Sequence, residues 1–182
     1  MTGKFAVSLL GLVASLAVAV PASATNFTMR NAKTGLCLGV QSANPADGTA
    51  VVTWDCDEST NQTWHEGEAF DGTGQYFHIV NHLTSNRCLG LNASSKLTNN
   101  FCNNDDSDNH NQGWWGSYIG DLTIPGETDP QHCFVFASYT NPFSQKVITT
   151  TADPRGNQPV IADSTFDPNN NKEQVWCLVD AP

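Results

Sequence analysis

The sequence predicts an all-β domain built from three copies of one unit. The first observation is a Gln-x-Trp triplet at the end of each copy, at residues 62–64, 112–114 and 174–176. The second is strand periodicity, since Leu36, Leu38 and Val40 alternate with other residue types along the first copy. The third is the turn chemistry between such runs, which is rich in Gly, Pro, Asn and Asp.

Internal self-similarity supports copies at about residues 25–66, 75–119 and 132–180. The aligned residues are Cys37 with Cys88, Leu38 with Leu89 and Gly39 with Gly90 at a shift of 51, and Phe27 with Phe136 and Leu38 with Val147 at a shift of 109. A unit of about 50 residues does not bury its own apolar face. We therefore expect the copies to close around a common core, which also removes exposed strand edges.

The first 24 residues have the composition of an export signal. Lys4 precedes an uncharged, mostly aliphatic run at residues 7–20, and residues 22–24 have the small-x-small pattern of a cleavage site. We expect a signal peptide at 1–24 and a secreted, extracellular domain at 25–182. A membrane anchor is the alternative, although the run is shorter than the ~20 residues that span a bilayer.

The charge disfavours several classes of partner. The chain has 18 acidic and 8 basic side chains, for a net charge of −10. Without Lys4, the expected mature domain has 7 basic residues and a net charge of −11 (7 − 18). Nucleic acids and anionic membranes repel such a domain, so we expect no nucleic-acid binding and no membrane insertion.

The motifs of the first copy resemble those of a known family. They are Cys-Leu-x-Val at 37–40, Asp-Gly-Thr-Ala-Val at 47–51, Trp-Asp-Cys at 54–56 and Asn-Gln-x-Trp at 61–64. This order is similar to one repeat of the R-type lectins, named for the ricin B chain. The resemblance is close in copy one, moderate in copy two and loose in copy three. It implies a β-trefoil, with three four-stranded repeats around a pseudo-threefold axis, and a carbohydrate-binding function.

Six cysteines in an exported chain suggest three disulfides. The simplest pairing is Cys37–Cys56 and Cys88–Cys102 within copies one and two, and by elimination Cys133–Cys177, whose strands would be adjacent in a trefoil. Other connectivities stay open, and metal binding is the rival interpretation of the cysteines. No Cys-x-x-Cys pair or neighbouring His supports it, so we expect no metal and no cofactor.

Four of the five tryptophans fall into two groups. Those that occupy the same place in every copy are predicted to be core residues, with a ligand role as the alternative: Trp64, Trp114 and Trp176. Trp54 has no such counterpart, because Asn100 and Asp163 stand at the matching places. A tryptophan found in one copy alone, on a polar hairpin, is typical of a binding surface.

A shallow sugar site needs a flat ring for the apolar C–H face and fixed polar groups for the hydroxyls. In copy one the resemblance assigns the ring to Trp54 and the amides to Asn61 and Gln62. It places a carboxylate at position 39, where this chain has Gly39. Losing a charge-assisted hydrogen bond costs ~1.5–3 kcal/mol, unless a nearby acid compensates. The nearby acids are Asp47, Asp55 and Asp57, for which a solvated surface role is the alternative.

The other copies depart further from the pattern. Copy two keeps the weaker candidates Asn111 and Gln112 but has Gly90 and Asn100 at the carboxylate and aromatic places. Phe101 is adjacent to Asn100, yet alternation along a strand points it to the other face. Copy three has Ile148, Asp163 and Glu173-Gln174 at the corresponding places. We therefore expect a site in copy one before copy two, and none of this type in copy three.

Catalytic patterns are missing from the sequence, so we expect a binding protein and not an enzyme. The acidic loop at 105–108 lacks the spacing of a calcium loop, and His78 and His82 do not form a His-Glu-x-x-His motif. Galactose-type glycans or glycoproteins are the first choice of ligand. The alternative is a degenerate trefoil scaffold that binds a protein partner, as an inhibitor or a toxin or assembly subunit. The aromatic segment 134–144 is either an interface for such a partner or the first strand of copy three.

Overall fold

The computed structural model describes residues 25–69, 75–103, 112–139, 146–150, 158–159, 161–163 and 171–181. The expected signal peptide, Asn111, the acidic loop at 105–108 and the side chain of Asp163 lie outside this description. In the described ranges, no helix combines the length and the apolar character that crossing a membrane requires.

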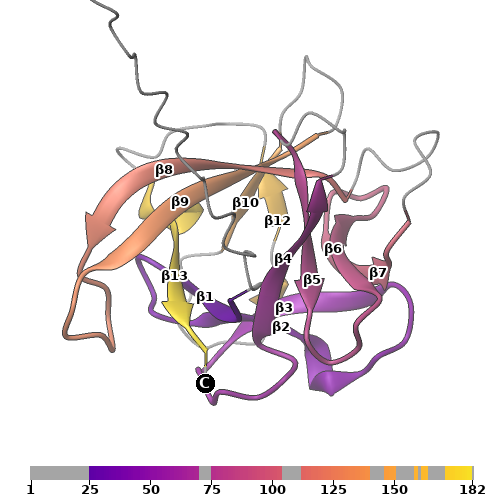
Figure 1. The fold of residues 1–182 in the computed structure, drawn as a ribbon, viewed down its shortest axis with the longest axis horizontal. Coiled ribbons are helices and arrows are strands. Elements are labelled where there is room, and N and C mark those ends of the chain that lie inside the picture. Colours follow the sequence, from indigo (N-terminus) through magenta and orange to yellow (C-terminus); the bar gives the residue numbers. More distant parts are fainter. Residues whose placement is uncertain are drawn as a thin grey trace, which may run out of the picture.

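Copies one and two contribute the four strands that the resemblance implies, and the described part of copy three contributes five (Figure 1). Copy one contains β1 (Phe27–Asn31), β2 (Cys37–Val40), β3 (Thr49–Trp54) and β4 (Thr63–Ala69). Copy two contains β5 (Phe77–Asn81), β6 (Arg87–Leu91), β7 (Leu97–Phe101) and β8 (Trp114–Leu122). Copy three contains β9 (Gln131–Ser138), β10 (Val147–Thr149), β11 (Gln158–Pro159), β12 (Ile161–Asp163) and β13 (Trp176–Asp180). Two short 3-10 turns accompany them, η1 (Gln41–Ala43) and η2 (Lys172–Gln174).

The first and last strands of the copies close a barrel. Antiparallel pairing runs from β1 to β4, β5, β8, β9 and β13, and β13 pairs with β1 again. The middle strands form the hairpins β2–β3, β6–β7 and β10–β12. This is the predicted β-trefoil. Because the barrel is closed, its strands have no free edge for pairing with another chain.

The triplet tryptophans are the centre of the core. All three are fully buried, and each indole N–H donates to a backbone oxygen of its own copy: Trp64 to Leu38 at 2.9 Å, Trp114 to Leu89 at 2.8 Å and Trp176 to Ile148 at 3.0 Å. The same hydrogen bond therefore recurs in every copy. It satisfies the one polar group that a buried indole carries.

These bonds correct the alignment of copy three. Leu38 corresponds to Ile148, and not to Val147, so the place of Gly39 is taken by Thr149 and not by Ile148. The strand register likewise makes Phe134, opposite Trp176, the counterpart of Phe27, opposite Trp64. One constant difference in residue number does not align copy three with copy one, because the loops of the two copies differ in length. Each strand of copy three therefore has its own difference in residue number from its counterpart in copy one.

The three predicted disulfides are confirmed. They are Cys37–Cys56 and Cys88–Cys102, which span 19 and 14 residues, and Cys133–Cys177, which joins facing positions of β9 and β13. All six thiols are used, which contradicts the metal interpretation of the cysteines. The first two bridges tie the start of β2 or β6 to the loop after the facing strand, so they hold the two ends of each hairpin together.

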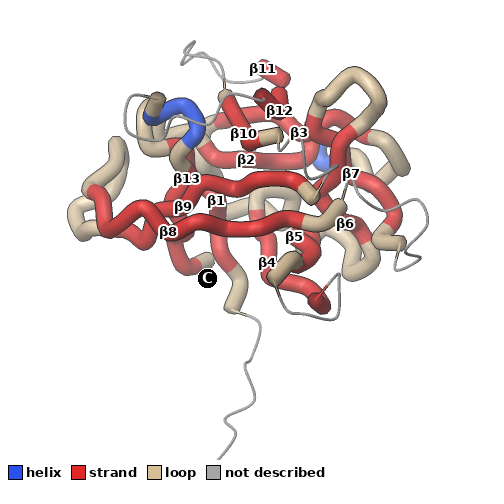
Figure 2. The backbone as a smooth tube through the Cα atoms, turned by 90° about the horizontal axis from the view of Figure 1, so that it is seen from above, coloured by secondary structure: helices blue, strands red, loops and turns tan. Residues whose placement is uncertain are grey.

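The hairpin of β8 and β9 extends beyond the barrel into the loop at 123–130, on the left in Figures 1 and 2. The hairpin and its loop contribute Val135 and Ile124 to a second apolar cluster, which also includes Cys177 of β13. Phe136 is buried in the main core, and Phe134 packs against it. The described part of segment 134–144 is therefore a strand of copy three, and not a free aromatic interface; Phe143 lies outside the described residues.

Candidate functional site

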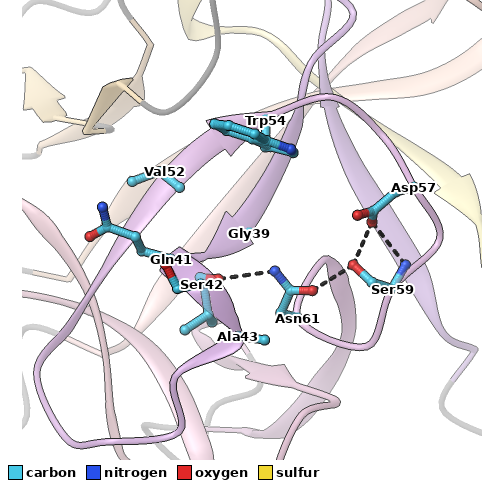
Figure 3. Close-up of a pocket in the computed structure, with 10 residues that line it drawn as sticks. Gly39, Gln41, Ser42, Ala43, Val52, Trp54, Asp57, Ser59 and Asn61 are labelled. Atoms are coloured by element: carbon cyan, nitrogen blue, oxygen red, sulfur yellow. Dashed lines mark hydrogen bonds between the residues drawn. The ribbon is translucent and has the colours of Figure 1, made fainter.

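A cavity of about 350 Å³ opens beside the hairpin of copy one (Figure 3). Ligand pockets usually span ~300–1,000 Å³, so this one suits a small ligand. Its walls come from β2 with η1, from β3 and from the loop that follows the second cysteine. The lining residues are Gly39, Val40, Gln41, Ser42, Ala43, Val52, Trp54, Asp57, Ser59 and Asn61.

Trp54 forms the upper wall of the cavity. It is the last residue of β3, lies opposite Cys37 in the ladder and is 46% exposed. The Cys37–Cys56 bridge ties the chain two residues after Trp54 to Cys37, the residue that Trp54 faces on β2. Figure 3 shows the indole above Gly39, with Asn61 on the other side of the cavity. The ring is thus held in place while one side stays accessible, as a stacking platform requires.

Gly39, at the floor, leaves no room for a side chain. A Cβ atom at this position would lie 2.9 Å from Cγ of Gln62 and 3.4 Å from the backbone oxygen of Asn61. Carbon atoms do not approach so closely without one of them moving. A side chain at position 39 would displace the loop at 61–62, because this loop packs directly against the glycine. The packing therefore excludes a carboxylate here unless the loop moves.

Asn61 is fixed by β2. Its Nδ2 donates to the backbone oxygen of Val40 at 3.0 Å, and the Val40 N–H donates to the Asn61 backbone oxygen at 2.9 Å. These two bonds set the orientation of the amide, with Oδ1 next to the hydroxyl of Ser59. Asn61 therefore presents a positioned carbonyl oxygen at the cavity.

The structure places Gln62 differently from the sequence-based expectation. The side chain is 1% exposed, its Nε2 donates to the backbone oxygen of Asp55 at 2.8 Å, and its Oε1 accepts from the backbone N–H of Asp57 at 3.1 Å. Residues two apart in an extended chain point to the same side, so Gln62 points inward with Trp64. It positions the cystine loop and does not line the cavity.

Of the three nearby acids, Asp57 is the one that lines the cavity. Its Oδ1 accepts from the backbone N–H of Ser59 at 3.1 Å and from the Ser59 hydroxyl. Asp47 instead accepts from the backbone N–H of Phe101 at 2.7 Å and pairs with Arg87 at 3.6 Å. Asp55 contributes its backbone oxygen to Gln62, and its carboxylate lies outside the lining.

Backbone strain is concentrated around this cavity. Four non-glycine residues of the described chain have a left-handed φ, namely Ser42 (55°), Ala43 (49°), Glu58 (57°) and Ser95 (59°). The first three belong to the two segments that form the cavity walls, at 41–43 and 57–59. Such conformations cost ~1–3 kcal/mol each and are concentrated at functional sites. Sequence reasoning missed η1; its only signal was the longer loop in copy one.

The described part of copy two differs from copy one at two of the cavity walls, the aromatic position and the hairpin turn. Asn100 lies opposite Cys88, where copy one has Trp54, and the β6–β7 turn has five residues (92–96) against eight (41–48) in copy one. Gln112 repeats the buried role of Gln62: it donates to the Phe101 backbone oxygen at 2.8 Å and accepts from the N–H of Asn103 at 3.1 Å.

Phe101 does not replace the missing ring. It is 53% exposed, but the Arg87 guanidinium lies 3.4 Å from the centre of the ring, and Arg87 Nε donates to the Pro45 backbone oxygen at 2.9 Å. The stack therefore joins the hairpins of copies one and two. In copy three, Thr149 and Asp163 take the places of Gly39 and Trp54, on the corrected register.

The sequence comparison agrees with this geometry. Residues 17–100 match the model of a family described as ricin-type β-trefoil lectin domain-like. The resemblance to the ricin B-type lectins is confirmed. The matched segment contains every residue that lines the cavity. None of the curated proteins matches the chain.

Solved structures share the β-trefoil fold at low identity. The β-trefoil lectin of the Vibrio vulnificus hemolysin/cytolysin, with N-acetyl-D-lactosamine bound, has a TM-score of 0.58 and 19% identity, over 88% of this chain and 97% of that one. The C-half of the earthworm R-type lectin, in complex with GalNAc, has a TM-score of 0.51 and 16% identity, over 86% of this chain and 98% of that one. An exo-β-1,3-galactanase from Clostridium thermocellum has a TM-score of 0.66 and 21% identity, over 88% of this chain but only 31% of the enzyme. The fold therefore occurs both in lectins and as part of an enzyme.

Proposed function

We propose that the chain is a secreted carbohydrate-binding protein without catalytic activity, and that its ligand site is the copy-one cavity. One observation carries the proposal: a half-exposed indole, Trp54, stands over a small cavity lined by fixed polar groups, within a ricin-type lectin-like repeat. The Trp54 ring stacks on the apolar C–H face of a sugar, and the Asn61 amide orients its hydroxyls. Gln62 acts indirectly, by positioning the loop.

Galactose-type glycans, free or on glycoproteins, are the first candidates. Two of the similar structures support this choice through their own ligands, N-acetyl-D-lactosamine and GalNAc. A single shallow site with one stacking ring binds weakly, with a Kd of about 1 mM, or about −4 kcal/mol. Copy two adds little, because it lacks both the ring and the longer loop, so we expect no strong gain from multivalency.

A glycan array tests the proposal. The oxidised domain 25–182 should bind galactose-terminated glycans, and Trp54→Ala should abolish the signal without unfolding the domain. Tyr118→Ala is the matched control, since Tyr118 is also an exposed aromatic residue (56%) but lies on the β8–β9 hairpin, outside the cavity lining. No glycan binding by the wild type, together with a protein partner that co-purifies, would overturn the proposal in favour of the scaffold alternative.

A further inference from the structure

Position 39 lacks the acid that the resemblance assigns to this site, while Asp57 lines the same cavity. If the copy-one cavity binds sugar, as proposed above, its ligand needs a carboxylate to accept from a hydroxyl, and position 39 has none. We propose that Asp57 supplies that carboxylate, so that the sugar is held between Trp54 and an acceptor row made of Asp57 and Asn61. The ligand is then a sugar with two neighbouring free hydroxyls on the edge that faces this row.

The packing at Gly39 excludes the family position for the acid. Any Cβ at position 39 meets Gln62 Cγ at 2.9 Å, and Gln62 is held by bonds to the backbone of residues 55 and 57. The same two bonds draw the chain after Cys56 against the hairpin, and this chain carries Asp57. The contact that closes position 39 therefore also positions the new acid.

The row has acceptor capacity that the hydrogen bonds within it do not fill. The Ser59 hydroxyl is within bonding distance of both Asp57 Oδ1 and Asn61 Oδ1, but a hydroxyl has one proton. The Asn61 amide does not turn to offer its NH₂ group instead, because Nδ2 is bonded to Val40. When Ser59 donates to Asp57, Asn61 Oδ1 lacks this donor, and a ligand hydroxyl supplies it.

Asp57 has capacity for a second ligand hydroxyl. A carboxylate accepts about four hydrogen bonds over its two oxygens, and both bonds from Ser59 go to Oδ1. Figure 3 shows Asp57, Ser59 and Asn61 linked in a row on one wall, with Trp54 above. A sugar ring stacked on the indole therefore meets two acceptors along one edge, both next to the Ser59 hydroxyl, and neighbouring hydroxyls are the sugar groups that pair with them.

The chain offers a matched control in Asp55. Asp55 and Asp57 are both exposed acids on the same loop, but Asp57 alone lines the cavity, and Asp55 acts through its backbone oxygen, which substitution by Asn retains. Asp57→Asn and Asp55→Asn remove the same charge two residues apart. In Asp57→Asn the new side-chain oxygen still accepts from the Ser59 N–H, so the loop is preserved. Equal unfolding temperatures for both variants verify this.

The experiment titrates the oxidised wild type and both variants with methyl β-galactoside and its 3-, 4- and 6-deoxy analogues, by tryptophan fluorescence. We expect Asp57→Asn to weaken galactoside binding about ten-fold or more, and Asp55→Asn to leave it within about two-fold. One deoxy analogue should bind the wild type as weakly as the galactoside binds Asp57→Asn. That analogue should bind both proteins equally, because the missing hydroxyl and the missing carboxylate belong to one hydrogen bond.

Failure of this inference and of the proposed function give different results. If neither the galactoside nor any glycan of the array binds the wild type, the proposed function fails, and the inference with it. The inference alone is overturned if the wild type binds the galactoside, Trp54→Ala does not bind it, and Asp57→Asn binds it with the same affinity as Asp55→Asn. Gly39→Asp combined with Asp57→Asn should not restore affinity, because packing closes position 39, and restoration would contradict that packing argument.

Discussion

Copies one and two share a scaffold but differ at the place where a ligand would bind. In both copies, the triplet Gln bridges the same two backbone groups of the cystine loop, with donor–acceptor distances of 2.8 and 3.1 Å in each. In both copies, the triplet Trp donates to the facing strand. These bonds recur because they hold the copy together, whatever it binds.

In the described residues, the differences lie in the hairpin. Copy one has Trp54 where copy two has Asn100, and it has the longer turn with two left-handed residues, Ser42 and Ala43. The comparison teaches that the Gln-x-Trp triplet reports the fold, while the proposed ligand site depends on residues outside the triplet. Trefoil copies are therefore best judged for binding by their hairpin ends.

The largest expected effect concerns the shared scaffold. Trp64→Ala and Trp114→Ala should each lower the free energy of unfolding by ~3–5 kcal/mol, because both remove a fully buried indole. Trp54→Ala should lower it by less than about 1 kcal/mol, since its ring is half exposed. Denaturant unfolding of the oxidised proteins measures all three. A Trp54→Ala loss as large as that of Trp64→Ala would show that Trp54 is a core residue.

A smaller effect separates the two glutamines. Gln62→Met and Gln112→Met should each cost ~1–3 kcal/mol of stability, because each change removes two hydrogen bonds at similar volume. Only Gln62→Met should also weaken sugar binding, since it releases the loop that carries Asp57. Parallel denaturation and sugar titration distinguish the two roles. Loss of sugar binding in Gln112→Met would assign ligand contacts to copy two.

The junction of the two copies should respond to pH. His65 on β4 and His78 on β5 lie where these strands pair, and burial lowers the pKa of both below 6.5, with the charge of His82 as a second cause at His65. As the pH falls through about 6.5, the unfolded chain binds protons that the folded chain does not, so stability decreases. The unfolding temperature should drop between pH 7 and pH 5, and less so in His78→Gln. Greater stability at pH 5 than at pH 7 would contradict this.

The smallest expected effect concerns the strained turn. Ala43→Gly should leave stability unchanged or raise it by up to about 1 kcal/mol, because glycine adopts a left-handed φ without cost. Ala93→Gly, in the shorter turn of copy two, should lower it by ~0.4–1 kcal/mol, because Ala93 is not among the left-handed residues. Equal losses in both variants would show that the turn at 41–43 is not strained.

The sequence predicted the fold better than the site, for a physical reason. Cystine spacing, strand periodicity and the triplets are local patterns, and they predicted the trefoil, the disulfides and the indoles of the core. The register of copy three depends on loop lengths, which a single shift does not represent, so Ile148 was assigned to the place of Gly39, one residue later than its true counterpart Leu38. The direction of Gln62 and the cavity wall at 41–43 depend on contacts between segments, and no local pattern encodes these.

The indole signals of the protein test the central claim most directly. The chain has five tryptophans, and the three of the triplets are buried and hydrogen bonded, so they act as internal references in a spectrum of ¹⁵N-labelled indole groups. On titration with a galactose-type sugar, the Trp54 signal should move saturably while the three core signals stay in place. A Trp54 signal that does not move while another indole responds would contradict the assignment of the site to the copy-one cavity.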